Sequence, residues 1–437
     1  MSYFIRFLKD ILVRNKTLKV KAFFHIFSFF MVKWNLAKMT FIQKGLPMKI
    51  GIDKIGFATS QYVLEMTDLA IARQVDPEKF SKGLLLDSLS ITPVTEDIVT
   101  LAASAANDIL SDEDKETIDM VIVATESSID QSKAASVYVH QLLEIQPFAR
   151  SFEMKEACYS ATAALDYAKL HVEKHPDSKV LVIASDIAKY GIKSTGESTQ
   201  GAGSIAMLIS QNPSILELKE DRLAQTRDIM DFWRPNYSDV PYVNGMFSTK
   251  QYLDMLKTTW KEYQKRFNTS LSDYAAFCFH IPFPKLALKG FNKILDNNLD
   301  EQKKAELQEN FEHSITYSKK IGNCYTGSLY LGLLSLLENS QNLKAGDQIA
   351  FFSYGSGAVA EIFTGQLVDG YQNKLQSDRM DQLNKRQKIT VTEYEKLFFE
   401  KTILDENGNA NFNTYRTGTF SLDSICEHQR IYKKINN

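Results

Sequence analysis

The sequence predicts a layered α/β protein built from two similar halves. Residues 120–124 and 180–184 are continuously apolar, which is typical of strands that helices cover on both faces. Segments with helical spacing alternate with such runs along most of the chain. One order of strand, loop, helix-opening turn and strand also occurs twice, which indicates an internal duplication.

Apolar runs predict the strands, and the 3.6-residue spacing of apolar side chains predicts the helices. We expect strands at residues 48–53, 120–124, 179–186, 207–209, 277–282 and 348–354. We expect helices at residues 95–110, 133–143, 160–174, 249–266, 328–338 and 391–401. His175 and Pro176 directly follow the third of these helices and end it, because proline cannot continue a helix.

The chain of 437 residues is longer than one hydrophobic core usually supports. We therefore expect two halves, residues 48–215 and residues 216–437. Residues 1–47 differ from both, since they carry nine Lys or Arg against one Asp. Their most apolar stretch, residues 22–32, spans about eleven residues and is shorter than the roughly twenty that a membrane helix requires.

Three interpretations of residues 1–47 remain open. The segment is a basic membrane-surface helix, an extension without a fixed fold, or sequence upstream of the natural start. Met48 opens the first patterned strand, which favours the third interpretation. A secretory signal is not expected, because no small-residue cleavage site follows the apolar stretch.

Composition excludes several classes of protein. Beyond residue 47 the chain holds 42 basic and 52 acidic residues, and this excess of acid disfavours nucleic-acid binding. The four cysteines show no zinc-ligand spacing, so we expect no metal and a reducing cytoplasm. Residues 201–206 fit a loose dinucleotide-loop pattern but lead into a strand, so we expect no nicotinamide cofactor.

Cys158 is the strongest candidate for a catalytic residue. It lies between the charged run 152–156 and a helix pattern that begins at Ser160. At the first turn of a helix, unpaired backbone N–H groups and the positive end of the dipole favour a thiolate. The alternative is a structural cysteine, since free cysteine often packs as a small hydrophobe.

The duplication predicts the neighbours of Cys158. Glu126 follows a strand of the first half, whereas His280 follows a strand of the second half and Asn323 precedes its helix-opening turn. Halves related by a pseudo-twofold axis would bring these strand ends together. Without the duplication, each residue has a structural alternative. Glu126 is equally compatible with capping a helix, and His280 with a hydrogen-bonded position in the core.

Six motifs strongly resemble those of hydroxymethylglutaryl-CoA synthase of the bacterial type. They are ATESS at 124–128, EACY at 156–159, DFWRP at 231–235, FHIP at 279–282, GNCYTGS at 322–328 and SYGSG at 353–357. The resemblance begins at Met48 and extends at least to Gly370. It implies a thiolase-like fold, with two duplicated halves in a layered αβαβα arrangement, and a homodimer. It also implies the condensation of acetyl-CoA with acetoacetyl-CoA in the mevalonate pathway, with no cofactor and no membrane span.

The resemblance assigns roles to individual residues. Cys158 would accept the acetyl group, Glu126 would remove a proton from its methyl group, and His280 would donate to the ketone oxygen. The N–H groups of Cys158 and Ser356 would form an oxyanion hole. The resemblance also implies that six further residues bind the substrates: Asn323, Lys285, Tyr190, Thr199, Ser248 and Asp76.

Other functions are compatible with parts of this pattern. A ketoacyl-carrier-protein synthase of the initiating type also uses Cys and His, but it lacks a glutamate base such as Glu126. A polyketide β-branching synthase keeps all three residues and takes its acyl group from a carrier protein. A cysteine thioester hydrolase would cleave thioesters without forming a carbon–carbon bond, and a non-catalytic scaffold would not need the three residues.

Overall fold

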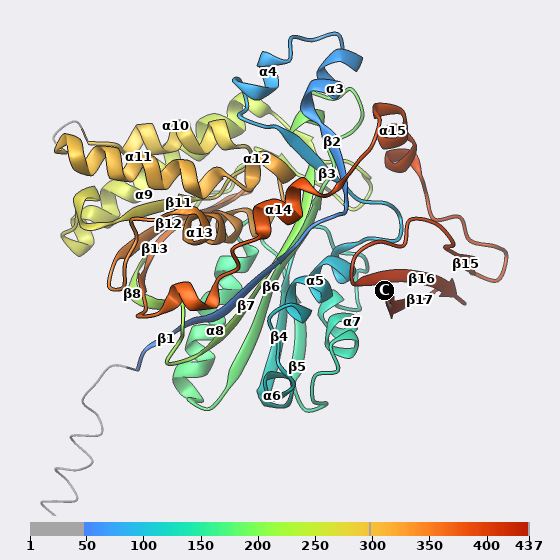
Figure 1. Ribbon diagram of the computed structural model, residues 1–437, viewed down its shortest axis with the longest axis horizontal. Coiled ribbons are helices and arrows are strands. Elements are labelled where there is room, and N and C mark those ends of the chain that lie inside the picture. Colours follow the sequence, from blue (N-terminus) through green and yellow to red (C-terminus); the bar gives the residue numbers. More distant parts are fainter. Residues whose placement is uncertain (1–47, 297–298, 436–437) are drawn as a thin grey trace, which may run out of the picture. The chain divides into compact units, whose positions relative to one another are not determined.

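Nine strands form one mixed sheet, and the strand order of its first half is repeated in its second half (Figure 1). The structure, a computed structural model, describes residues 48–296 and 299–435, so the predicted extension over residues 1–47 lies outside the described residues. In the first half the order is β1 (Ile50–Ala58), β7 (Gly201–Gln211), β6 (Lys179–Ala188), β4 (Ile118–Ala124) and β5 (Arg150–Met154). In the second half it is β8 (Leu216–Thr226), β13 (Val359–Leu367), β12 (Gln348–Gly355) and β11 (Ala276–Phe279).

The pairing directions are the same in the two halves. In the first half, β1 pairs with β7 and β7 with β6, both antiparallel, and β6 then pairs with β4 in parallel. In the second half, β8 pairs with β13 and β13 with β12, both antiparallel, and β12 then pairs with β11 in parallel. The halves join where β1 pairs with β8 at Gly51–Glu217 and Ile52–Leu216. The backbone therefore confirms the predicted duplication.

Helices cover both faces of each half-sheet. The outer helices of the first half are α5 (Ile98–Asn107) and α7 (Ala135–Leu142), and those of the second half are α9 (Gly245–Phe267), α10 (Pro284–Ile294) and α11 (Glu301–Ile315). The helices α8 (Ser160–Lys174) and α13 (Ser328–Asn339) lie between the two half-sheets. These layers agree with the expected αβαβα arrangement.

Alternation along single strands shows why the apolar runs are continuous. In β6, Val180 and Val182 face the central layer, while Leu181 and Ile183 face the outer helices α5 and α7. In β12, Phe351 faces the central layer and Phe352 the outer helices of the second half. Because both faces are buried, neither strand contains the polar alternation of a half-exposed sheet.

The chain after β13 lies outside the repeat and packs mainly on the first half. The strand β14 (Gln387–Lys388) pairs with β2 (Tyr62–Glu65), which itself pairs with β3 (Ser88–Ile91). The small sheet β15 (Ala410–Asn411), β16 (Phe420–Cys426) and β17 (Gln429–Lys434) contacts α5 and α7. Asp97, the N-cap of α5, accepts hydrogen bonds from Arg430 (3.1 Å) and Tyr432 (2.6 Å) of β17.

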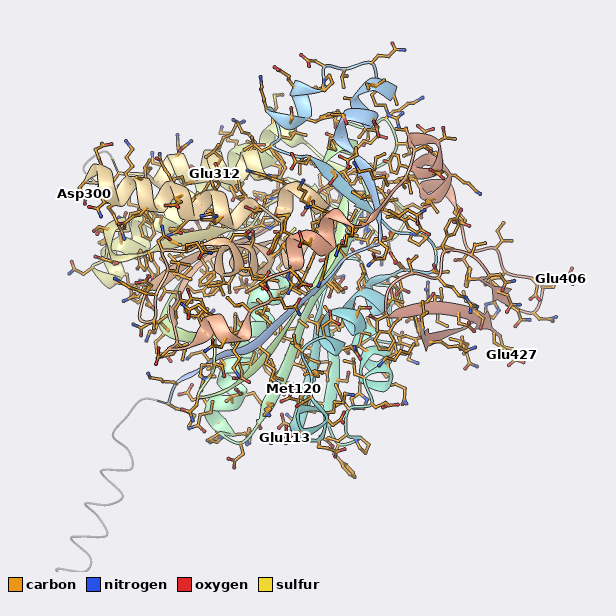
Figure 2. The ribbon with its side chains drawn as sticks, viewed as in Figure 1. Glu113, Met120, Asp300, Glu312, Glu406 and Glu427 are labelled. Atoms are coloured by element: carbon orange, nitrogen blue, oxygen red, sulfur yellow. The ribbon has the colours of Figure 1, made fainter. Side chains whose placement is uncertain are left out.

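The remaining elements are short. They comprise the helices α3 (Met66–Ala72), α4 (Glu78–Ser81), α6 (Asp112–Thr117), α12 (Ser318–Ile321), α14 (Arg379–Asn384) and α15 (Val391–Phe399), the strands β9 (Phe232–Trp233) and β10 (Tyr242–Val243), and the 3₁₀ turns η1 (Glu197–Thr199), η2 (Leu271–Asp273), η3 (Tyr325–Gly327) and η4 (Tyr371–Lys374). Acidic side chains such as Glu113, Glu312 and Glu427 project from the surface of the body (Figure 2). No helix within residues 48–296 or 299–435 is both long and apolar enough to cross a membrane.

Several predicted boundaries were wrong, and three of them have a clear local reason. The helix expected at 95–110 begins only at Ile98, because Asp97 accepts the N–H groups of Val99 and Thr100 as an N-cap. The helix expected from 249 begins at Gly245, where Asn244 caps it. The strand expected at 277–282 ends at Phe279, so His280 lies just beyond the sheet.

The central layer should contribute strongly to stability. Leu165 on α8 is fully buried in the central core, and Leu165→Ala is expected to lower the free energy of unfolding by about 3 kcal/mol. Leu170 lies on the same helix but is 54% exposed, so Leu170→Ala should change the free energy of unfolding by less than about 0.5 kcal/mol. Urea unfolding measures both, and equal losses would contradict the assignment of α8 to a buried layer.

Candidate active site

Cys158 lies in the turn that precedes α8, and its side chain meets Glu126 at the end of β4. The Cys158 thiol donates a hydrogen bond to Glu126 Oε1, with 2.8 Å between the two atoms. Ala157 has a left-handed backbone with a φ of 43°, which turns the chain sharply just before the cysteine. A Cβ atom at Gly355 would lie 2.7 Å from Tyr159 N, so only glycine lets β12 approach this turn.

Asp186 fixes the position of Glu126. The Asp186 Oδ1 atom accepts the Glu126 N–H (2.9 Å) and the Thr125 hydroxyl (2.7 Å). Its Oδ2 atom accepts the N–H of Thr326 (3.1 Å), which belongs to the second half. The next helix, α7, begins only at Ala135, so the alternative in which Glu126 caps a helix is wrong.

Burial determines the charges of this pair. It raises the pKa of Glu126 to about 8, and the nearby Asp186 carboxylate acts in the same direction. Burial, and then the negative charge of Glu126, raise the pKa of the Cys158 thiol far above its usual value. The expectation that the start of the helix favours a thiolate was therefore wrong for the free protein, because desolvation and a carboxylate in contact outweigh the helix dipole.

His280 follows β11 and is neutral at working pH, since burial lowers its pKa to about 3. Its Nδ1 atom lies 2.7 Å from Ser328 Oγ, which also accepts the N–H of Ile281 (3.0 Å). Among the described residues the hydrogen of the Ser328 hydroxyl has no other acceptor, so the hydroxyl is placed to donate to Nδ1. We assign the hydrogen of the neutral imidazole to Nε2 on this basis.

A cavity of about 290 Å³ joins the two halves at this point. It is lined by seven of the ten predicted residues, namely Cys158, His280, Asn323, Ser356, Tyr190, Thr199 and Ser248. Tyr190, Phe232 and Tyr325 pack against one another by their rings and form its apolar wall. Thus residues far apart in sequence meet in one pocket, as the duplication predicted.

Asn323 is held by the protein on both sides of its amide. Its Oδ1 atom accepts the N–H of Tyr325 (2.8 Å), and its Nδ2 atom donates to the Tyr190 hydroxyl (3.2 Å). The hydrogen-bond partner of His280 is Ser328 and not Asn323. Asn323 therefore positions the aromatic wall of the cavity.

Three of the ten predicted residues do not line the 290 Å³ cavity. Glu126 touches Cys158 but lines an adjoining cavity of about 680 Å³, and the two cavities share Phe232 and Ser356. Lys285 lies at the start of α10, where its N–H donates to the carbonyl of the rim residue Leu84 (3.0 Å). Asp76 precedes α4 and accepts the N–H of Glu78 (2.9 Å), away from both cavities.

Sequence reasoning missed four residues that build the site: Asp186, Ser328, Phe232 and Tyr325. An aspartate inside the apolar run 179–188 was a visible signal, because a buried carboxylate needs donors. The other three occur in motifs noted above, but no spacing rule indicates their contacts. Within the described residues, no group of three or more His, Cys, Asp or Glu side chains could hold a metal ion.

The contact between Glu126 and Cys158 predicts how the thiol reacts. Glu126→Gln removes the negative charge beside Sγ, so the pKa of the thiol should fall and iodoacetamide should alkylate Cys158 several-fold faster at pH 8. Buried Cys278, whose pKa is raised by burial alone, provides the control within the same protein. Peptide mass spectrometry follows both sites, and slower alkylation of Cys158 in the variant would contradict the prediction.

Comparisons with known proteins agree with this geometry. The model of the hydroxymethylglutaryl-coenzyme A synthase N-terminal region matches residues 46–214, and that of the C-terminal region matches residues 221–318 and 292–434. A hydroxymethylglutaryl-CoA synthase of Enterococcus faecalis is 55% identical over 355 residues, which cover 81% of this chain and 92% of that protein.

A more distant relative and a solved structure also belong to this group of synthases. The polyketide biosynthesis 3-hydroxy-3-methylglutaryl-ACP synthase PksG of Bacillus subtilis is only 29% identical, over 80% of this chain and 87% of that protein. A crystal structure of HMG-CoA synthase complexed with CoA is 72% identical, with a TM-score of 0.88, and the match covers 89% of this chain and all of that one. The chain belongs to the hydroxymethylglutaryl-CoA synthase family.

Proposed function

We propose that this protein condenses acetyl-CoA with acetoacetyl-CoA and water to give hydroxymethylglutaryl-CoA and CoA, in the mevalonate pathway. The observation that carries the proposal is the contact of the Cys158 thiol with the Glu126 carboxylate, beside a cavity that His280 also lines. A nucleophile and a neutral donor at one cavity, with a base in contact with the nucleophile, are what a condensation through an acyl-enzyme requires.

The first step forms acetyl-Cys158. Sγ attacks the carbonyl carbon of acetyl-CoA, and the thiol proton passes to Glu126, which already accepts its hydrogen bond. The bond from the carbonyl carbon to the sulfur of CoA breaks, and CoA leaves with a proton. The raised pKa of Glu126 makes the carboxylate basic enough for this exchange at neutral pH.

The second step forms the carbon–carbon bond. Glu126 removes a proton from the acetyl methyl group, and the resulting enolate attacks the ketone carbon of acetoacetyl-CoA. Negative charge grows on the ketone oxygen, where the Nε2–H of neutral His280 donates a hydrogen bond. The alkoxide then takes up a proton to become the 3-hydroxyl group, which balances the proton that Glu126 removed and later releases. The N–H groups of Cys158 and Ser356 would stabilise the thioester oxygen, and water finally releases the product from Cys158.

Other residues would bind and shape the substrates. Tyr190, Thr199 and Ser248 line the cavity and would contact the acyl groups. Lys285 lies beside the rim residue Leu84, where its ammonium group would meet the phosphates or the pantetheine of CoA. Asp76 would lie farther out, toward the nucleotide. CoA thioesters are the substrates in this proposal, and no metal or other cofactor takes part.

The proposal includes a homodimer in the cytoplasm. β5 pairs only with β4 and is an edge strand of the large sheet, and an exposed edge can pair with a second copy. Four cysteines without disulfide partners fit a reducing compartment. A carrier-protein acyl donor, as in the PksG-type relatives, would be recognised by activity with acetyl-carrier protein and none with acetyl-CoA.

Glu126→Gln should separate the two half-reactions. We expect acetylation of Cys158 by acetyl-CoA to persist, because the thiol ionises more readily without the Glu126 charge and can pass its proton to water. Condensation should fall about 10³-fold, because the methyl proton has no base. In the unsubstituted protein the condensation rate should fall about tenfold per pH unit below about pH 8, since protonation removes the Glu126 carboxylate. Mass spectrometry of the Cys158 peptide and quenched-flow analysis of product measure the two steps.

Cys158→Ser is the control for that experiment and should lose both steps. Near-normal condensation by Glu126→Gln would show that another group is the base. Release of acetate and no new carbon–carbon bond from either protein would indicate a thioester hydrolase instead.

Ser328→Ala tests the tautomer of His280. Without the hydroxyl, Nδ1 competes with Nε2 for the hydrogen, so kcat/KM for acetoacetyl-CoA should fall by about 10- to 100-fold. Acetylation of Cys158 should stay within about twofold, because His280 does not act in that step. Ser328→Thr keeps a hydroxyl and should restore part of the activity. Equal losses in both steps would indicate a merely structural serine.

A further inference from the structure

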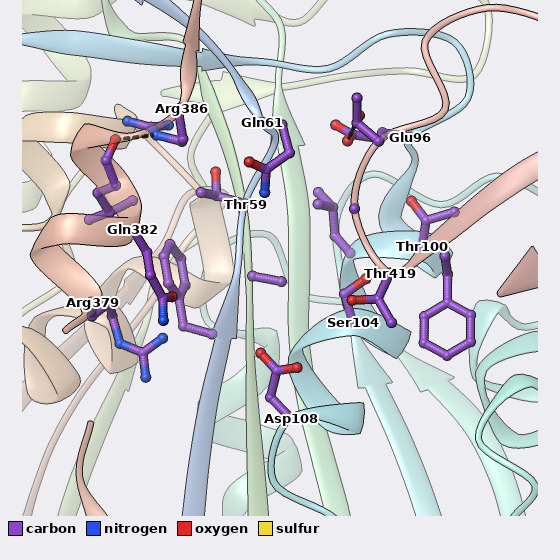
Figure 3. Close-up of a pocket in the computed structure, with 17 residues that line it drawn as sticks. Thr59, Gln61, Glu96, Thr100, Ser104, Asp108, Arg379, Gln382, Arg386 and Thr419 are labelled. Carbon is purple, nitrogen blue, oxygen red and sulfur yellow. Dashed lines mark hydrogen bonds between the residues drawn. The ribbon is translucent and has the colours of Figure 1, made fainter. Parts of the chain in front are cut away.

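A separate polar cavity, of about 130 Å³, lies beside α5 (Figure 3). Three distant parts of the chain enclose it: the end of β1, the helix α5, and the C-terminal segment that includes α14 and residues 417–420. It shares no lining residue with either cavity at Cys158 and Glu126. The proposed reaction therefore gives it no role.

Glu96 gives this cavity an acceptor without a partner. Its side chain is only 5% exposed, and its Oε1 atom accepts the hydroxyl of Thr417. Its Oε2 atom is buried and has no hydrogen-bond partner among the described residues, since the nearby Ser60 hydroxyl, which lowers the pKa of Glu96, donates to the carbonyl of Ile91 (2.7 Å). Burial raises the pKa of Glu96 to about 7. A buried oxygen without a donor costs about 1–3 kcal/mol, so a ligand that supplies a donor has a clear energetic reason to bind.

Arg386 gives the cavity a cation that no carboxylate of the described residues contacts, although Glu65 acts on it from farther away. It is 6% exposed, and it donates to Ser90 Oγ (2.6 Å) and to the carbonyls of Lys320 (2.8 Å) and Leu383 (3.0 Å). Those bonds use three of the five N–H groups of a guanidinium, and among the described residues no carboxylate forms an ion pair with it. The neighbouring Arg379, by contrast, is neutralised by Glu338.

Glu96 and Arg386 line one cavity from opposite sides and do not pair with each other (Figure 3). Exposed Gln61 and Asp108 line it as well and offer a way in from solvent. Since water occupies about 30 Å³ per molecule, the space corresponds to about four waters, or to a solute of about five to eight non-hydrogen atoms.

We propose that this cavity is a binding site for a small zwitterionic amino acid. The ligand's ammonium group would donate to the Glu96 carboxylate, and its carboxylate would accept from the two remaining N–H groups of Arg386. Such a ligand neutralises both buried charges at once, whereas a simple anion or a simple amine leaves one of them without a partner.

Binding would also stabilise the C-terminal segment. Thr417 donates to the same Glu96 carboxylate, and the segment it begins runs into β16. A ligand on Glu96 therefore holds residues 417–420 against α5. Slower amide hydrogen exchange in residues 410–435 is the expected consequence.

Glycine, β-alanine and γ-aminobutyrate are the probes, because they place the two charged ends at three different spacings. At about 100 times its dissociation constant, the amino acid that fits should raise the melting temperature of the full-length protein by about 3 °C. Acetate and ethylamine, each with one of the two ends, should leave it unchanged at equal ionic strength. A titration calorimeter measures the same binding directly.

Two variants locate the effect. Glu96→Gln should abolish the rise in melting temperature. Ser104→Leu should also abolish it, because the larger side chain fills the cavity. This second variant keeps the test decisive if Glu96→Gln folds poorly. Glu113→Gln, on the exposed surface of α6, is the matched control and should keep it. If none of the three amino acids stabilises the protein more than acetate and ethylamine do, or if Ser104→Leu retains the full effect, the proposal is wrong and the cavity holds water only.

Discussion

The proposed chemistry of this protein depends on one hydrogen bond, from the Cys158 thiol to the Glu126 carboxylate. Both groups are buried. The Glu126 carboxylate disfavours the thiolate of Cys158, whereas the hydrogen bond from the thiol favours the ionised form of Glu126, so the proton of the ionised pair stays on sulfur. A free thiolate at a helix start would react with many electrophiles. A thiol whose proton can pass to an adjacent base remains unreactive until a thioester binds. Once Cys158 is acylated, the same carboxylate lies beside the new methyl group, so one residue can serve both steps.

The duplicated sheet makes this contact possible. Each half supplies a parallel strand that ends at the interface, and these strands carry Glu126 in the first half and His280 in the second. The buried Asp186 carboxylate ties the two halves together, because it accepts N–H groups from Glu126 and from Thr326. The rigid central layer of α8 and α13 then fixes Cys158 and Ser328 against those strand ends. Precise placement of this kind is how a fold turns ordinary side chains into a catalyst.

Much of this arrangement could be predicted from the sequence. Continuous apolar runs indicated doubly covered strands, and the repeated order of elements brought Cys158, Glu126 and His280 together. The charge state of Cys158 could not be predicted, because burial and a contact with Glu126 depend on the three-dimensional packing. Ser328 and Phe232 escaped for the same reason, since their roles are contacts and not patterns. The C-terminal strands β16 and β17 pack on the first half although they follow the second, which no local signal reveals.

The most direct test of the account follows an acetyl group through Cys158. The unsubstituted protein is incubated with isotopically labelled acetyl-CoA, and the peptide that contains Cys158 is analysed by mass spectrometry before and after acetoacetyl-CoA is added. The account predicts that the label first appears on Cys158 and then leaves as part of hydroxymethylglutaryl-CoA. A label that never appears on Cys158, or one that leaves only as acetate, would contradict it.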